Sequence, residues 1–289
     1  MKAFVDWVLA RRLRLVIVAT VAAPLLPAVA AALIALQTAR RNATWGTVCG
    51  VGVTCGLVLL ALLSRTDVPL FAAIGVICAL TGVAVGGLIR RAGNLVLAFQ
   101  AAVLACWVVV SVIGVLGIDA RPFFAPAIEE LVALLPTDTP PEQVTFLQQR
   151  SATVLLATAV FSQVIGALLL GFWWTLVAAG QRRFGHEFRQ LKLGRVLGAI
   201  ATALVALGLV FDAALVQNLT PLALLGFLVQ GVAVLHAWTH AKRWHPASMG
   251  LLYLLLLMPG LNVLIVLPVS MLGLVDCWFD LRASLRAQA

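Results

Sequence analysis

Eight apolar runs make up most of this 289-residue chain and limit its folds more than any other feature. They cover residues 13–38, 46–63, 68–88, 94–117, 151–179, 196–216, 221–240 and 248–276. Most approach the roughly 20 residues that a helix needs to cross a bilayer core of about 30 Å. A backbone surrounded by lipid must satisfy its hydrogen bonds within its own segment, so every run is predicted to be helical.

Composition supports the same class of protein. Hydrophobic residues make up 63% of the chain and charged residues 11%, whereas a soluble domain carries about 25% charged residues. The sequence therefore predicts an all-α, polytopic integral membrane helical bundle that forms a single membrane domain over residues 1–289. The net charge of +9 is typical of cytoplasmic loops facing a bilayer. Nucleic acid is not an expected partner, because no basic stretch is interleaved with stacking aromatics.

The charges of the connections predict an orientation. Residues 118–150 form an acidic connection, and residues 181–195 form a strongly basic one. Since Lys and Arg collect in cytoplasmic loops, we expect 118–150 to face outward and 181–195 to face the cytoplasm. The protein is then expected to be a multi-pass membrane protein with 181–195 on the cytoplasmic side.

The first and last runs depart from this alternation, because basic residues flank each of them on both sides. Each also contains prolines, Pro24 and Pro27 in the first run and Pro259 and Pro268 in the last. Proline removes a helical hydrogen bond and kinks or ends a helix. We therefore predict six full crossings plus two proline-broken or hairpin segments, with both termini cytoplasmic. Eight full crossings are the alternative.

The outer connection carries the pattern of a short amphipathic helix. Its apolar residues recur at helical spacing at Phe124, Ile128, Leu131 and Leu135. Such a helix is suited to lie on the membrane or to cap a cavity. A second helix is expected to begin near Pro140 and to continue into the fifth run.

The basic connection is predicted to form a surface helix. Phe184, Phe188 and Leu191 share one face of it. The opposite face carries Arg182, Arg183, Arg189 and Lys192. This face would lie against anionic headgroups, or alternatively bind a protein partner.

Catalytic motifs are missing from the sequence. It holds no phosphate-binding loop ending in Gly-Lys-Ser/Thr, no HExxH and no serine elbow. The five cysteines are dispersed, which argues against a disulfide framework or zinc knuckle. We therefore expect no enzymatic activity and no cofactor.

A few polar residues interrupt the apolar runs and are candidates for ligand binding. A polar side chain is costly against lipid, so each is expected to face other helices. It would either bond between helices or line a ligand pocket. The candidates are Gln163, Gln230, His236 and Asn262. We expect the 122–135 helix to cover an outward-facing cavity lined by the two glutamines.

Small residues four positions apart recur in the first three runs, at Ala19 and Ala23 and at glycine pairs such as Gly82 and Gly86. This spacing lets helix backbones approach closely. The N-terminal half is therefore predicted to be a compact bundle.

Two carboxylates, Asp276 and Asp280, close the last run four residues apart. They should share one face of a helix that emerges at the cytoplasmic surface. Neither Arg282 nor Arg286 lies three or four positions from them, so local pairing is expected to be awkward. We expect both carboxylates to bind the basic connection instead. Its cations are Arg182, Arg183, Arg189, Lys192 and Arg195.

The C-terminal string "QGVAVLHAWTHAKRW … LVDCWFDLR" and the upstream "HEFRQLKLGR" resemble the YybS-like predicted membrane proteins of bacteria, a family of unknown function. The resemblance implies a distant kinship to the substrate-binding membrane subunits of energy-coupling-factor transporters. Those subunits dock to an ATP-powered module through small residues on their first helix. Ala19 and Ala23 match that feature here.

These observations favour a non-enzymatic inner-membrane protein that binds or helps to transport a small-molecule solute. The resemblance adds an ATP-hydrolysing protein as a partner. The alternative is a membrane scaffold or regulator that recruits a cytoplasmic partner through 181–195 and the C-terminal helix.

Overall fold

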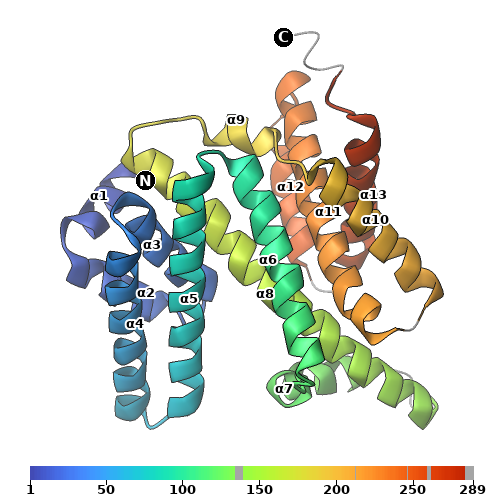
Figure 1. Ribbon diagram of the computed structural model, residues 1–289, viewed down its shortest axis with the longest axis horizontal. Coiled ribbons are helices and arrows are strands. Elements are labelled where there is room, and N and C mark those ends of the chain that lie inside the picture. Colours follow the sequence, from blue (N-terminus) through green and yellow to red (C-terminus); the bar gives the residue numbers. More distant parts are fainter. Residues whose placement is uncertain (134–138, 212, 246, 259–261, 284–289) are drawn as a thin grey trace. The chain divides into compact units, whose positions relative to one another are not determined.

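The computed structural model describes residues 1–133, 139–211, 213–245, 247–258 and 262–283, which contain helices and no strand (Figure 1). The predicted all-helical class is confirmed. Within the described residues, five helices are long and apolar enough to cross a membrane: Ala43–Ser64, Val68–Ala92, Leu95–Val115, Pro141–Ala178 and Leu215–Ala241. The chain forms two compact units. Unit 1 comprises residues 1–102 and 162–192, and unit 2 comprises residues 103–161 and 193–289.

Unit 1 is built around its N-terminal helices. They are α1 (Lys2–Ala10), α2 (Arg12–Ala22), α3 (Pro27–Arg40), α4 (Ala43–Ser64) and α5 (Val68–Ala92). The start of α6 (Leu95–Val115), the end of α8 (Pro141–Ala178) and α9 (Phe184–Arg189) complete the unit. Side-chain caps fix the helix starts. Asn42 accepts the Trp45 N–H at 3.0 Å, and Asp67 accepts the Leu70 N–H at 3.1 Å.

The first apolar run is broken where its prolines predict. Helix α2 ends at Ala22, and α3 begins at Pro27, whose missing N–H suits the first turn. The chain reverses at this break. The Arg12 guanidinium lies 3.4 Å from the centre of the Trp45 ring at the start of α4, and Thr38 near the end of α3 faces Gly46 of the same helix. Both ends of the run therefore lie beside the first turn of α4.

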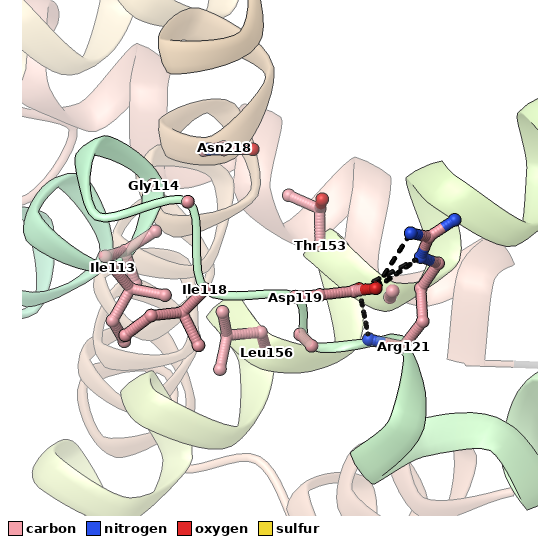
Figure 2. Close-up of a pocket in the computed structure, with 12 residues that line it drawn as sticks. Ile113, Gly114, Ile118, Asp119, Arg121, Thr153, Leu156 and Asn218 are labelled. Carbon is pink, nitrogen blue, oxygen red and sulfur yellow. Dashed lines mark hydrogen bonds and ion pairs between the residues drawn. The ribbon is translucent and has the colours of Figure 1, made fainter.

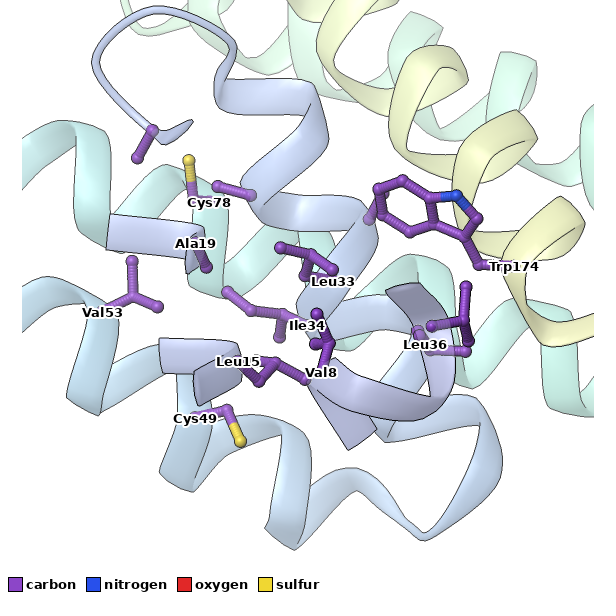
Figure 3. Close-up of a cluster of buried hydrophobic side chains, with 14 of the residues drawn as sticks. Val8, Leu15, Ala19, Leu33, Ile34, Leu36, Cys49, Val53, Cys78 and Trp174 are labelled. Atoms are coloured by element: carbon purple, nitrogen blue, oxygen red, sulfur yellow. The ribbon is translucent and has the colours of Figure 1, made fainter. Parts of the chain in front are cut away.

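Glycines bring the helices of unit 1 into close contact, as their spacing predicts. A Cβ added at Gly50 would lie 2.6 Å from the Ala79 Cβ, and one added at Gly82 would lie 2.6 Å from the Ile34 Cβ. Neither distance is sterically tolerable, so only glycine fits. The buried cluster between these helices includes Leu15, Ile34 and Val53 (Figure 3).

Unit 2 contains the rest of α6 and α8, the short helix α7 (Arg121–Ala133) and the C-terminal helices. The C-terminal helices are α10 (Gly194–Val210), α11 (Ala214–Ala241), α12 (Ala247–Leu257) and α13 (Asn262–Phe279). Helices α10 and α11 form a hairpin, in which Gln217 Nε2 donates to the carbonyls of Gly208 at 3.1 Å and Phe211 at 2.9 Å. Helix α13 packs on α11, where a Cβ at Gly273 would collide with the Phe227 carbonyl.

The last apolar run is divided into α12 and α13, as predicted; Pro259 itself lies outside the described residues. Helix α7 covers most of the segment expected to be amphipathic, with Ile128 buried and Glu129 exposed. Leu135 lies outside the described residues. Helix α8 is continuous through Arg150 into the fifth run, in agreement with the sequence.

Candidate functional site

The connection between α6 and α7 borders a cavity in unit 2 that is open to solvent (Figure 2). Its volume is about 330 Å³, at the small end of the range for sites that bind small molecules. Residues from α6, the connection, α7, α8 and α11 line it. They are Val110, Ile113, Gly114, Gly117, Ile118, Asp119, Ala120, Arg121, Ala152, Thr153, Leu156 and Asn218.

An ion pair forms the charged rim of this cavity. Arg121 Nη2 lies 2.7 Å from Asp119 Oδ2, and Arg121 Nε donates to Asp119 Oδ1 at 2.9 Å. Asp119 also accepts the Arg121 backbone N–H at 2.9 Å, at the start of α7. The side chains are 45% and 55% exposed, so solvent reaches both charges. The hydrogen bonds from Arg121 lower the pKa of Asp119, which keeps this carboxylate ionised.

The wall of the cavity contains neutral polar groups as well as apolar ones. Asn218 of α11 lies against Gly114 of α6, where an added Cβ would be only 2.9 Å from Asn218 Nδ2. Thr153 of α8 lies in the view of Figure 2 between Asn218 and the ion pair. An amide, a hydroxyl and both signs of charge therefore face one small space.

None of the residues that we predicted to bind ligand lines this cavity. Gln163 belongs to unit 1, where its Nε2 donates to the Pro27 carbonyl at 3.4 Å. His236 Nε2 lies 2.6 Å from the Tyr253 hydroxyl, between α11 and α12. The Asn262 side chain lies outside what the structure describes. Their roles in ligand binding stay predictions.

Gln230, the fourth candidate, belongs to a buried polar network in unit 2. Gln230 is 0% exposed, Asp276 3% and Arg282 6%. Asp276 Oδ2 accepts from Gln230 Nε2 at 2.7 Å and from Arg282 Nη2 at 2.6 Å. Gln230 Oε1 accepts the Leu193 N–H at 2.9 Å. The network joins the start of α10, the middle of α11 and the end of α13.

The expectation that local pairing of Asp276 is awkward was wrong. Helix α13 ends at Phe279, and Asp280 adopts a left-handed conformation with φ +45°. This turn carries Arg282 back to Asp276, although six positions separate them. Trp278 Nε1 also donates to Thr202 Oγ1 at 3.2 Å and thereby anchors α13 on α10. A contact of Asp280 with the basic connection stays a prediction, and Arg286 lies outside the described residues.

The basic connection contains one residue that sequence reasoning missed. Glu187 is buried at 9% exposure, and its Oε2 accepts the Leu95 N–H at 3.2 Å. It therefore caps the start of α6. Arg182 is exposed, and partial burial of Arg189 lowers the pKa of its guanidinium. A lone acid among basic residues was the only signal for Glu187 in the sequence.

Ala19 and Ala23 are fully buried within unit 1. Ala19 lies beside Leu15 in the buried cluster (Figure 3). Burial supports the packing role of these alanines, because a helix of another protein could bind them only if unit 1 uncovered them.

The cavity offers two opposite charges, hydrogen-bonding groups and an apolar wall, which suits the binding of a small polar molecule. No protein-family model, no curated protein and no solved structure matches the chain.

Proposed function

We propose that this chain is a non-enzymatic, multi-pass protein of a bacterial inner membrane that binds a small zwitterionic solute for transport. The observation that carries the proposal is the Asp119–Arg121 pair at the rim of a small cavity. The number of crossings, the kinship to YybS-like proteins and an ATP-hydrolysing partner belong to the same proposal and rest on the sequence alone.

The paired rim favours a zwitterion over a simple ion. A ligand with an ammonium and a carboxylate can exchange partners with Asp119 and Arg121, so every charge stays compensated. A simple anion or cation could pair with only one of the two side chains, so it would form fewer charge-assisted hydrogen bonds with the rim than a zwitterion does. Asn218 and Thr153 supply hydrogen bonds that orient the bound molecule.

Equilibrium binding to the purified full chain tests the proposal. The probes are glycine betaine, proline and alanine as zwitterions, with acetate and methylammonium as simple ions. We expect saturable binding of at least one zwitterion and none of the simple ions. Asp119→Asn and Arg121→Gln should each weaken binding about tenfold or more, because each removes a charge-assisted hydrogen bond.

Arg150→Gln is the matched control, since Arg150 is an exposed arginine of unit 2 that does not line the cavity. Its affinity should equal that of the wild type. Absence of binding by every zwitterion, or an equal loss in the Arg150 variant, contradicts the proposal. The first result would favour the alternative of a membrane scaffold that recruits a cytoplasmic partner.

A further inference from the structure

Unit 1 contains a second cavity, of about 700 Å³, where the ends of the first apolar run meet the start of α4. It is lined by residues of α1 to α4 and of the turn between α3 and α4. They are Asp6, Leu9, Ala10, Arg12, Gln37, Arg40, Arg41 and Trp45. We call this cavity the basic cleft.

The basic cleft carries an excess of positive charge. Three arginines against one aspartate leave a formal charge of +2 on its lining. None of the three arginines makes an ion pair within the part of the chain that the structure describes. Arg12 is held in place by the Trp45 ring, 3.4 Å away. The cleft is thus suited to attract an anion.

A buried amide adds a hydrogen-bonding group to the cleft. Gln37 is 9% exposed and lines the cleft, and its side chain has no hydrogen-bond partner among the described residues. The amide N–H groups of Gln37 can donate to a ligand oxygen in the cleft, so Gln37 suits a bound group with acceptor atoms.

We propose that the basic cleft binds a phosphate group carried on a larger molecule. Guanidinium groups form paired hydrogen bonds with phosphate oxygens, and the amide of Gln37 would donate another. The volume of the cleft exceeds that of one phosphate ion, so the cleft has room for the rest of a larger molecule.

Two sources could supply this group. The cleft lies at the ends of the apolar helices α2, α3 and α4, the level at which a membrane protein meets phospholipid headgroups. A soluble phosphorylated molecule would present the same chemistry. The experiment has one arm for each source.

The first arm adds diphosphatidylglycerol to the detergent-solubilised full chain and measures the retained lipid by native mass spectrometry. Phosphatidylcholine, a zwitterionic lipid without net charge, is the comparison. The second arm titrates inorganic pyrophosphate at low salt by calorimetry. We expect binding in at least one arm. The Arg40→Gln/Arg41→Gln double variant should weaken it about tenfold or more. Both arginines are exposed, so the variant should fold.

The control variant Arg65→Gln/Arg182→Gln also removes two exposed arginines of unit 1, but neither lines the cleft. It should bind with wild-type affinity. Gln37→Leu should weaken binding without changing the charge. Diphosphatidylglycerol binding that Arg40→Gln/Arg41→Gln abolishes assigns the cleft to a lipid, and the same result with pyrophosphate assigns it to a soluble phosphate. No binding in either arm, or equal losses in the two double variants, overturns the proposal.

Discussion

Asp276 is a buried carboxylate whose charge is compensated by one buried arginine and one buried amide. Removing a single partner of such a pair costs about 3–5 kcal/mol, because the remaining charge stays buried. Arg282→Met should therefore strongly lower the thermal unfolding temperature of the purified protein. Asp276→Asn should have a similar effect, since it removes the negative charge that compensates the buried Arg282 guanidinium.

The double variant Asp276→Leu/Arg282→Leu is the informative comparison, because it removes both charges together. It should be less destabilised than the sum of the single variants. Additive losses would show that the two side chains contribute independently and that the ion pair is unimportant.

The pKa of Asp119 predicts how binding at the cavity beside Asp119 and Arg121 depends on pH. Its pKa in the folded protein is lowered from the ordinary value of 3.8 by hydrogen bonds from Arg121. A lowered pKa means that the ion pair is intact above that ordinary value and is lost only as the pH falls through the lower folded pKa. Zwitterion affinity should therefore be constant from pH 8 to about pH 5. A loss of affinity centred near neutral pH would show that a different group titrates.

At the scale of helices, Gly82 and Gly87 of α5 form a matched pair. An added Cβ at Gly82 meets Ile34 and the Ala31 carbonyl, whereas nothing lies within 4 Å of one added at Gly87. Gly82→Ala should destabilise unit 1 by roughly 1–3 kcal/mol. Gly87→Ala should be neutral or stabilising by up to about 1 kcal/mol, since alanine favours helix. Thermal unfolding of the two variants checks the contrast, and equal effects would contradict close packing of α3 on α5.

The breaks between helices were predictable because they depend on local chemistry. Pro24 and the basic flanks of the first run were enough to predict that α2 and α3 are separate, and the apolar spacing around Ile128 was enough to suggest α7. Contacts distant in sequence were not predictable. Glu187 caps Leu95 across 92 positions, and nothing around either residue indicates the partner.

In the candidate sites, too, local features were predictable and contacts distant in sequence were not. The sequence identifies Gln230 and Asp276 as unusual polar residues in apolar segments. It does not predict that they form a hydrogen bond, because this contact depends on how α11 and α13 pack. The return of Arg282 depends on a left-handed Asp280, which glycine-based turn signals do not reveal. Asp119 and Arg121 look like ordinary loop charges until Asn218 is brought beside them.

At the scale of the whole molecule, the charge pattern predicts which segments face outward. In a background without native cysteines, single cysteines at Ala3, Thr139 and Ala283 can be treated with a membrane-impermeant maleimide in intact cells. We expect labelling of position 139 alone, because the basic flanks predict that both termini are cytoplasmic. Labelling of position 3 or 283 before the membrane is permeabilised would contradict the predicted orientation.

The reversal between α2 and α3 constrains how the chain enters the bilayer during synthesis. Helix α2 has 11 residues and α3 has 14, fewer than the roughly 20 that a spanning helix needs. The buried face of α3 is covered by α4 and α5, which leave the ribosome later. Neither α2 nor α3 can therefore serve as a membrane anchor by itself. If residues 12–40 enter the bilayer as the predicted hairpin, we expect their stable insertion to wait until α4 emerges, so that translation of α4 sets the time of entry.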